Sequence, residues 1–104
     1  MKILLLGSTG QLGSDILREL SKSNLFNIYA PISSELDLSK KNFIDEIFNK
    51  KFDYIINCVA IHDLNFSENN KDQSYLINAD VPKKLAEYCE QKNCNLIHFS
   101  TDYV

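Results

Sequence analysis

The stretch Lys2-Ile3-Leu4-Leu5-Leu6-Gly7-Ser8-Thr9-Gly10-Gln11-Leu12-Gly13 is an apolar run that ends in a glycine-rich turn. The run predicts a short buried strand, and the residues after the turn predict a helix. Glycine lets the backbone turn tightly, approach a ligand and pack helix against strand, while the first N–H groups of a helix stay unpaired. This arrangement is typical of sites that hold a pyrophosphate. We therefore expect a nucleotide-binding α/β domain.

The spacing of the turn is G-x-x-G-x-x-G, one residue longer in its first gap than the dinucleotide fingerprint G-x-G-x-x-G. A glycine-rich turn without a ligand is the alternative. The preceding strand, the following helix and the presence of all three glycines of the chain in this turn favour the binding site. The cofactor-binding candidates here are Gly7, Thr9, Gly10, Gln11, Leu12 and Gly13.

The composition is that of an ordinary globular protein of one domain, with 104 residues, 44% of them hydrophobic. A net charge of -3 gives no electrostatic reason to expect nucleic-acid or membrane binding. No apolar stretch approaches the roughly 20 residues that span a bilayer. The three cysteines are odd in number and lack C-x-x-C spacing, so we expect neither a disulfide framework nor a metal site. We expect cysteines that fill apolar space, and a cytoplasmic protein.

The order of elements predicts strands at residues 2–6, 26–30, 54–59 and 95–99, and helices at 11–21, 40–49 and 71–91. Ser39 is the expected N-cap of the second helix, and Pro82 is expected to kink or restart the third. This β-α-β-α-β-α-β alternation predicts an incomplete Rossmann-type, doubly wound parallel sheet of order 3-2-1-4. The ligand would lie at the carboxyl ends of strands 1 and 4. We expect residues 1–104 to be the amino-terminal part of such a domain, without a substrate domain.

The adenosine end of the site is less defined. An acidic residue about 20 positions after the glycines usually holds the ribose of NAD. Glu35 comes a little late for that role, and no arginine stands nearby to hold the 2′-phosphate of NADP. The choice between NADH and NADPH therefore stays open. Asp37 and Leu38 either line the adenine or form a polar turn before the helix.

Two strand ends carry small or hydroxylated residues. Asn57-Cys58-Val59-Ala60 ends the third strand, where small side chains allow either a cofactor or close packing. Ser100 and Thr101 follow the fourth strand, where their hydroxyls either orient a carbonyl or cap the strand end.

Other polar residues have simpler interpretations. His62 and Asp63 are adjacent in a polar loop, so a solvated histidine is favoured over a catalytic pair. Asn78 interrupts an apolar face, where a buried amide ties down backbone. His98 lies within a strand, as a satisfied core histidine would.

Together these motifs resemble the extended short-chain dehydrogenase/reductase family, and within it the dTDP-4-dehydrorhamnose reductases. The resemblance covers the whole chain. It rests on the glycine turn with its strand, Glu35-Leu36-Asp37-Leu38, Asp53-Tyr54-Ile55-Ile56-Asn57-Cys58-Val59-Ala60, Leu76-Ile77-Asn78-Ala79 and His98-Phe99-Ser100-Thr101-Asp102-Tyr103-Val104.

The resemblance implies NAD(P)H-dependent reduction of a nucleotide-linked 4-keto sugar. It implies that Thr101 polarises the keto group and that Asp102 lies at the substrate. It also assigns the pyrophosphate to the glycine turn and the adenine to residues 37–38. The nicotinamide half falls to Cys58, Val59, Ala60, Phe99 and Ser100.

The family's proton donor belongs to a Tyr-x-x-x-Lys pair further along the chain, and we expect no counterpart of it within residues 1–104. We therefore expect the isolated chain to be inactive. A non-catalytic dinucleotide-binding or regulatory protein on the same fold, or a truncated remnant, is the alternative. We also expect strand 4 to be an exposed edge through which copies self-associate.

Overall fold

A computed structural model of the chain describes residues 1–32, 34–38, 40, 42–59 and 80–99. The described part alternates strands and helices as the sequence predicts. The elements are β1 (Lys2–Leu6), α1 (Gln11–Leu20), β2 (Asn27–Tyr29), α2 (Phe43–Ile47), β3 (Tyr54–Asn57), α5 (Val81–Lys92) and β4 (Asn95–His98).

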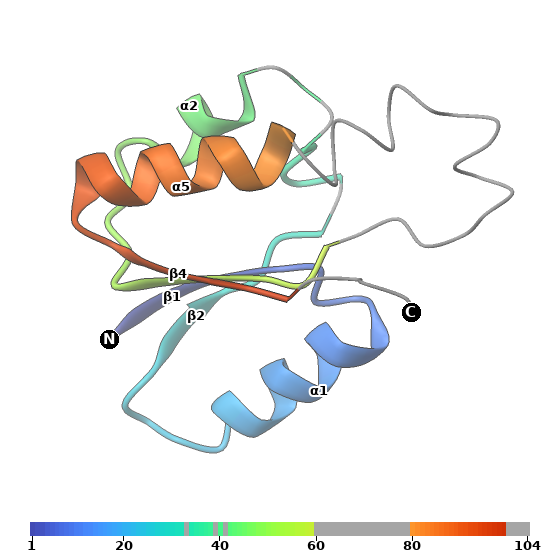
Figure 1. The fold of residues 1–104 in the computed structure, drawn as a ribbon. Helices are drawn as coiled ribbons and strands as arrows, with labels where there is room; N and C mark the ends of the chain where they lie inside the picture. Colours follow the sequence, from blue (N-terminus) through green and yellow to red (C-terminus); the bar gives the residue numbers. More distant parts are fainter. Residues whose placement is uncertain (33, 39, 41, 60–79, 100–104) are drawn as a thin grey trace, which may run out of the picture.

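All four strands pair in parallel in one sheet, which confirms the α/β class (Figure 1). The order is β2-β1-β3-β4, so the predicted order 3-2-1-4 is wrong. β3 pairs with β1, in the register Ile3 with Tyr54 through Leu6 with Asn57, and not with β2. β4 then adds to the far side of β3.

The apolarity of β3 explains this order. Ile55, Ile56 and Asn57 are buried, whereas β2 has only three residues and none of them is buried. A parallel strand that is apolar on both faces belongs in the interior of a sheet, between neighbours and under helices. The first connection therefore places β2 on one side of β1, and the next places β3 on the other side. The crevice at the carboxyl ends of the strands falls between β1 and β3, where this order switches. The ligand was predicted at the carboxyl ends of strands 1 and 4, and its position is corrected to the ends of β1 and β3.

The helices form a layer on each face of the sheet (Figure 1). α2 and α5 cover one face and enclose the larger core, in which Leu4, Ile55 and Leu85 are fully buried. α1 covers the other face, where Ile3, Leu5 and Ile56 form a smaller core with Ile16, Leu17 and Leu20 of the helix packed against it.

The second predicted helix begins later than expected. α2 starts at Phe43 with Asn42 as its N-cap, so Ser39 is not the cap residue. Pro82 lies in the first turn of α5, where a missing N–H costs nothing. α5 ends at Lys92, and its C-cap residue Asn93 adopts the left-handed conformation (φ 57°). The predicted residues 71–79 lie outside the described part.

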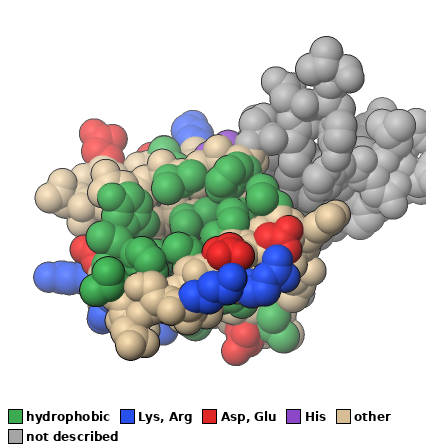
Figure 2. Space-filling model, turned by 90° about the horizontal axis from the view of Figure 1, so that it is seen from below, with side chains coloured by type: hydrophobic (Ala, Val, Ile, Leu, Met, Phe, Trp, Pro, Cys, Tyr) green, Lys and Arg blue, Asp and Glu red, His purple; other side chains and the backbone are tan. Residues whose placement is uncertain are grey.

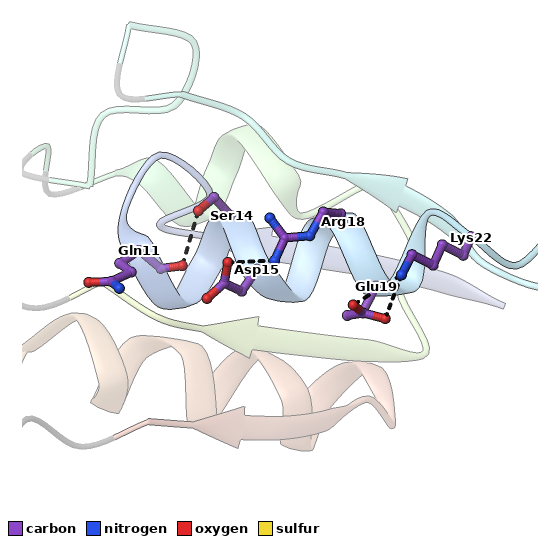
Figure 3. Close-up of polar contacts among 6 residues, drawn as sticks. All are labelled: Gln11, Ser14, Asp15, Arg18, Glu19 and Lys22. Atoms are coloured by element: carbon purple, nitrogen blue, oxygen red, sulfur yellow. Dashed lines mark hydrogen bonds and ion pairs between the residues drawn. The ribbon is translucent and has the colours of Figure 1, made fainter.

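The outer surface of α1 is polar. Arg18 bonds Asp15 at 2.9 Å, Lys22 bonds Glu19 at 3.2 Å, and the Ser14 hydroxyl donates to the Gln11 carbonyl (Figure 3). On the same side of the molecule, hydrophobic side chains form a patch next to the charged groups (Figure 2). No helix among the described residues is long and apolar enough to cross a membrane.

Candidate nucleotide-binding site

The glycine turn joins β1 to α1 at the carboxyl end of the sheet. Gly7 has a φ of +83°, which side-chain-bearing residues rarely adopt. The N–H of Gly10 then donates to the Gly7 carbonyl at 3.2 Å, which closes the turn. Gly10 has extended backbone and is the N-cap of α1, without a side-chain cap.

The three glycines are required for different reasons. A Cβ on Gly13 would lie 1.9 Å from the Gly7 carbonyl oxygen, so this glycine lets the helix pack against the turn. A Cβ on Gly7 would lie 2.9 Å from the backbone of Cys58, so this glycine lets β1 and β3 come together. A Cβ on Gly10 would meet nothing closer than 3.5 Å, and its φ of -77° suits any residue.

Packing within the described part therefore gives no reason for a glycine at position 10. Gly10 is exposed, as are the next residues Gln11 and Leu12. The first N–H groups of a helix have no partner within it, and the helix dipole adds partial positive charge there. An anion that approaches these groups needs the space in which a side chain at position 10 would stand. The turn therefore fits a pyrophosphate.

The end of β3 forms the other wall of this crevice. The N–H of Cys58 donates to the Leu6 carbonyl at 2.9 Å, which carries the β1–β3 pairing up to the glycine turn. Cys58 and Val59 are half-buried beside Gly7. Burial raises the pKa of the Cys58 thiol. At pH 7 this thiol is therefore protonated and lines the crevice as a neutral side chain.

Asn57 organises this strand end, a role that the sequence analysis did not assign. Its side chain is fully buried, and its Oδ1 accepts from the N–H of Val59 at 3.1 Å. This bond turns Nδ2 toward His98 of β4, whose Nδ1 accepts at 3.0 Å. The signal in the sequence was a single amide inside an otherwise apolar strand.

The predicted environment of His98 was wrong, because this residue is exposed and not in the core. Its partner across the strands is Asn57. Next to it, Phe99 donates its N–H to the Asn57 carbonyl at 3.1 Å, so the end of β4 is tied to the end of β3. Phe99 itself is 38% exposed.

The adenine candidates lie between β2 and α2. Leu38 is half-buried and packs against the larger core, which also includes Leu6 and Val59 at its edge. Asp37 is half-buried as well. Thr9, in the glycine turn, is exposed. The other predicted site residues lie outside the described part of the chain: Ala60, His62, Asp63, Asn78, Ser100, Thr101 and Asp102.

Tyr88 and Lys92 of α5 have the spacing Tyr-x-x-x-Lys, which the sequence analysis overlooked. Tyr88 is 2% exposed, and its hydroxyl lies 3.2 Å from the Ile47 carbonyl and also contacts that of Lys50. Lys92 lies over the ring of Phe48. Burial raises the pKa of Tyr88, the opposite of what a proton donor needs. Tyr88 is therefore a core residue.

The cysteines are free, and Cys89 and Cys94 belong to the larger core, as expected of apolar filler. Burial, together with the hydrogen bond from its thiol to Cys94, raises the pKa of Cys89 to about 12. Within the part of the chain that the structure describes, no group of three or more His, Cys, Asp or Glu residues is arranged to hold a metal ion.

Comparison with known proteins gives the family of the chain. The family model described as RmlD substrate binding domain matches residues 1–104. The chain belongs to this family. It is 33% identical over 103 residues to a dTDP-4-dehydrorhamnose reductase of Mycobacterium tuberculosis, covering 99% of the chain and 33% of that protein.

Solved structures of family members share the fold. A dTDP-4-dehydrorhamnose reductase from Clostridium acetobutylicum is 33% identical, with a TM-score of 0.83 over 92% of this chain and 34% of that one. One from Bacillus anthracis, solved in complex with NADP, is 24% identical, with a TM-score of 0.79 over 91% of this chain and 34% of that one. This chain thus spans about a third of the length of its relatives.

Proposed function

We propose that residues 1–104 are the amino-terminal part of an NAD(P)-binding Rossmann domain in a cytoplasmic reductase of a nucleotide-linked 4-keto sugar. The proposed reaction is dTDP-4-dehydrorhamnose to dTDP-L-rhamnose. The observation that carries the proposal is the open space at Gly10, before an uncapped helix. Membership of the RmlD family supplies the substrate class.

In this proposal each part of the crevice binds a different part of the cofactor or the substrate. The N–H groups of Gly10, Gln11 and Leu12 bind the pyrophosphate, and Asp37 with Leu38 lines the adenine. Cys58, Val59, Ala60, Phe99 and Ser100 line the nicotinamide half. When bound, the reduced nicotinamide supplies the hydride for the ketone. Thr101 donates a hydrogen bond to the keto oxygen, and Asp102 contacts the sugar.

Titration with NADPH and NADH tests the cofactor site. Gly10→Val places a branched side chain in the open space, so we expect binding of either cofactor to fall at least about tenfold, the equivalent of losing one charge-assisted hydrogen bond. Cofactor fluorescence gives the Kd. Ser21→Val, at the other end of α1, is the matched control and should bind like wild type. Equal affinity for Gly10→Val and wild type would contradict the proposal.

A second candidate is dinucleotide binding without reduction. For residues 1–104 taken alone it is favoured by the burial of Tyr88, which leaves the one described Tyr-x-x-x-Lys sequence unable to donate a proton at the site. A ketone that receives a hydride needs a positioned acid, typically worth about 10²–10⁴-fold in rate. A threonine hydroxyl is too weak an acid to replace it.

We therefore expect residues 1–104 alone to bind cofactor but not to turn over. The measurement is NADPH oxidation with dTDP-4-dehydrorhamnose, with a complete reductase of the family as positive control. Turnover close to that of the complete enzyme would show that a proton donor lies within these residues.

We also propose that copies of this chain associate through β4. The N–H groups of Asn95 and Phe99 donate toward β3, so those of Leu96 and His98 point to the opposite side. No strand of the described part lies beyond this edge. Ile97 is 41% exposed there, and β4 carries no charged residue or proline that would discourage pairing.

A further inference from the structure

A cavity lies at the end of the sheet opposite the glycine turn. Its volume is about 600 Å³, which falls within the range of small-molecule sites. Its lining residues come from the start of β1, from β2 and from the loop between α2 and β3: Lys2, Asn27, Ile28, Tyr29, Asn49, Lys50, Lys51 and Phe52. No residue of the proposed cofactor crevice is among them.

The charge of this lining is one-sided. Lys2, Lys50 and Lys51 face it, and no Asp or Glu does. The chain as a whole has a net charge of -3, so this concentration of positive charge runs against the overall balance. Two further charges lie beside Lys2 outside the lining: the Met1 amino group, held by the Leu25 carbonyl at 3.0 Å, and the Asp53 carboxylate, which accepts from the Lys2 backbone N–H at 2.8 Å. Clustered charge of this kind attracts anions.

One ammonium group is already held in place. Lys50 Nζ lies 4.4 Å from the centre of the Tyr29 ring, in a cation–π contact. The Tyr29 ring lies parallel to that of Phe52, with 6.3 Å between ring centres. Phe52 is only 8% exposed, so the wall on which Lys50 rests is anchored in the core.

β2 contributes backbone donors as well. The N–H of Asn27 donates to the Met1 carbonyl at 2.7 Å, so the next N–H, that of Ile28, points away from β1. The Ile28 side chain packs on the α1 side of the sheet, whereas the Tyr29 side chain packs on the other. Ile28 therefore borders the cavity with its backbone.

We propose that this cavity is a second ligand site, which binds a small organic phosphate with an apolar or aromatic body. The phosphate would lie among the lysines and the Ile28 N–H, where charge-assisted hydrogen bonds form. The apolar body would lie against Tyr29, whose ring is supported by the buried Phe52. The site is separate from the cofactor crevice and does not depend on the proposed function.

Phenyl phosphate is a suitable probe, followed by amide chemical shifts of the whole chain. We expect shifts at Ile28 and Lys51, with weaker binding of inorganic phosphate, which lacks the ring, and of phenol, which lacks the charge. The double variant Lys50→Gln/Lys51→Gln should weaken phenyl phosphate binding at least about tenfold. Lys22→Gln/Lys83→Gln, which removes two lysines elsewhere, should bind like wild type.

Three outcomes would overturn the proposal. They are equal affinity in the Lys50→Gln/Lys51→Gln variant and wild type, shifts centred on residues 7–13, and equal binding of inorganic and phenyl phosphate. Gly10→Val separates this site from the cofactor crevice, because it should leave phenyl phosphate binding unchanged. Circular dichroism of each variant verifies that the fold is kept.

Discussion

At the scale of single residues, Gly10 and Gly13 can be compared by the effect that an added side chain has on stability. The Cβ of Gly13→Ala would lie 1.9 Å from a backbone oxygen, so α1 must move, and we expect a loss of about 1–3 kcal/mol or more in unfolding free energy. Gly10→Ala, whose Cβ would lie 3.5 Å from the same oxygen, should stay within about 1 kcal/mol of wild type. Urea denaturation measures both. Equal losses would contradict the separate roles given to these glycines.

At the scale of elements, Tyr88 joins α5 to the end of α2. Tyr88→Phe keeps the ring in the core but leaves the carbonyls of Ile47 and Lys50 without their hydroxyl partner. The Ile47 carbonyl still accepts from the Lys50 N–H at 3.1 Å. We therefore expect the unfolding free energy to fall by about 0.5–1.5 kcal/mol, the net contribution of a hydrogen bond. Tyr54→Phe, on a half-buried strand position, is the control and should change stability less. An unchanged urea midpoint for Tyr88→Phe would show that the hydroxyl contributes nothing.

For the molecule as a whole, the proposed self-association through the exposed edge at β4 can be tested directly. Two copies paired antiparallel about a two-fold axis at Ile97 would place Leu96 opposite His98 of the other copy and bury Ile97. Sedimentation equilibrium of wild type should therefore show concentration-dependent association. Ile97→Lys should abolish it, while Ser21→Lys on α1 should not. A wild-type chain that stays monomeric at high concentration would contradict the proposal.

The class of fold and the position of the glycine turn could be predicted from the sequence, because both depend on local patterns. Short apolar runs, amphipathic spacing and clustered glycines act over a few residues, so they are visible without neighbours in space. The α/β alternation and parallel pairing were predicted in this way and are confirmed. The start of α2 was misplaced, since Ser39 suits a cap in sequence but the helix begins after Asn42.

Only the tertiary structure decided what depends on contacts between distant residues. It placed β3 beside β1 because β3 is buried on both faces, and it paired Asn57 with His98 across 41 positions of sequence. It also showed that Tyr88, spaced like a catalytic tyrosine from Lys92, is a buried link between helices. Spacing along the chain gives the order of chemical groups, whereas burial and the neighbours brought by folding decide whether a group can meet a ligand.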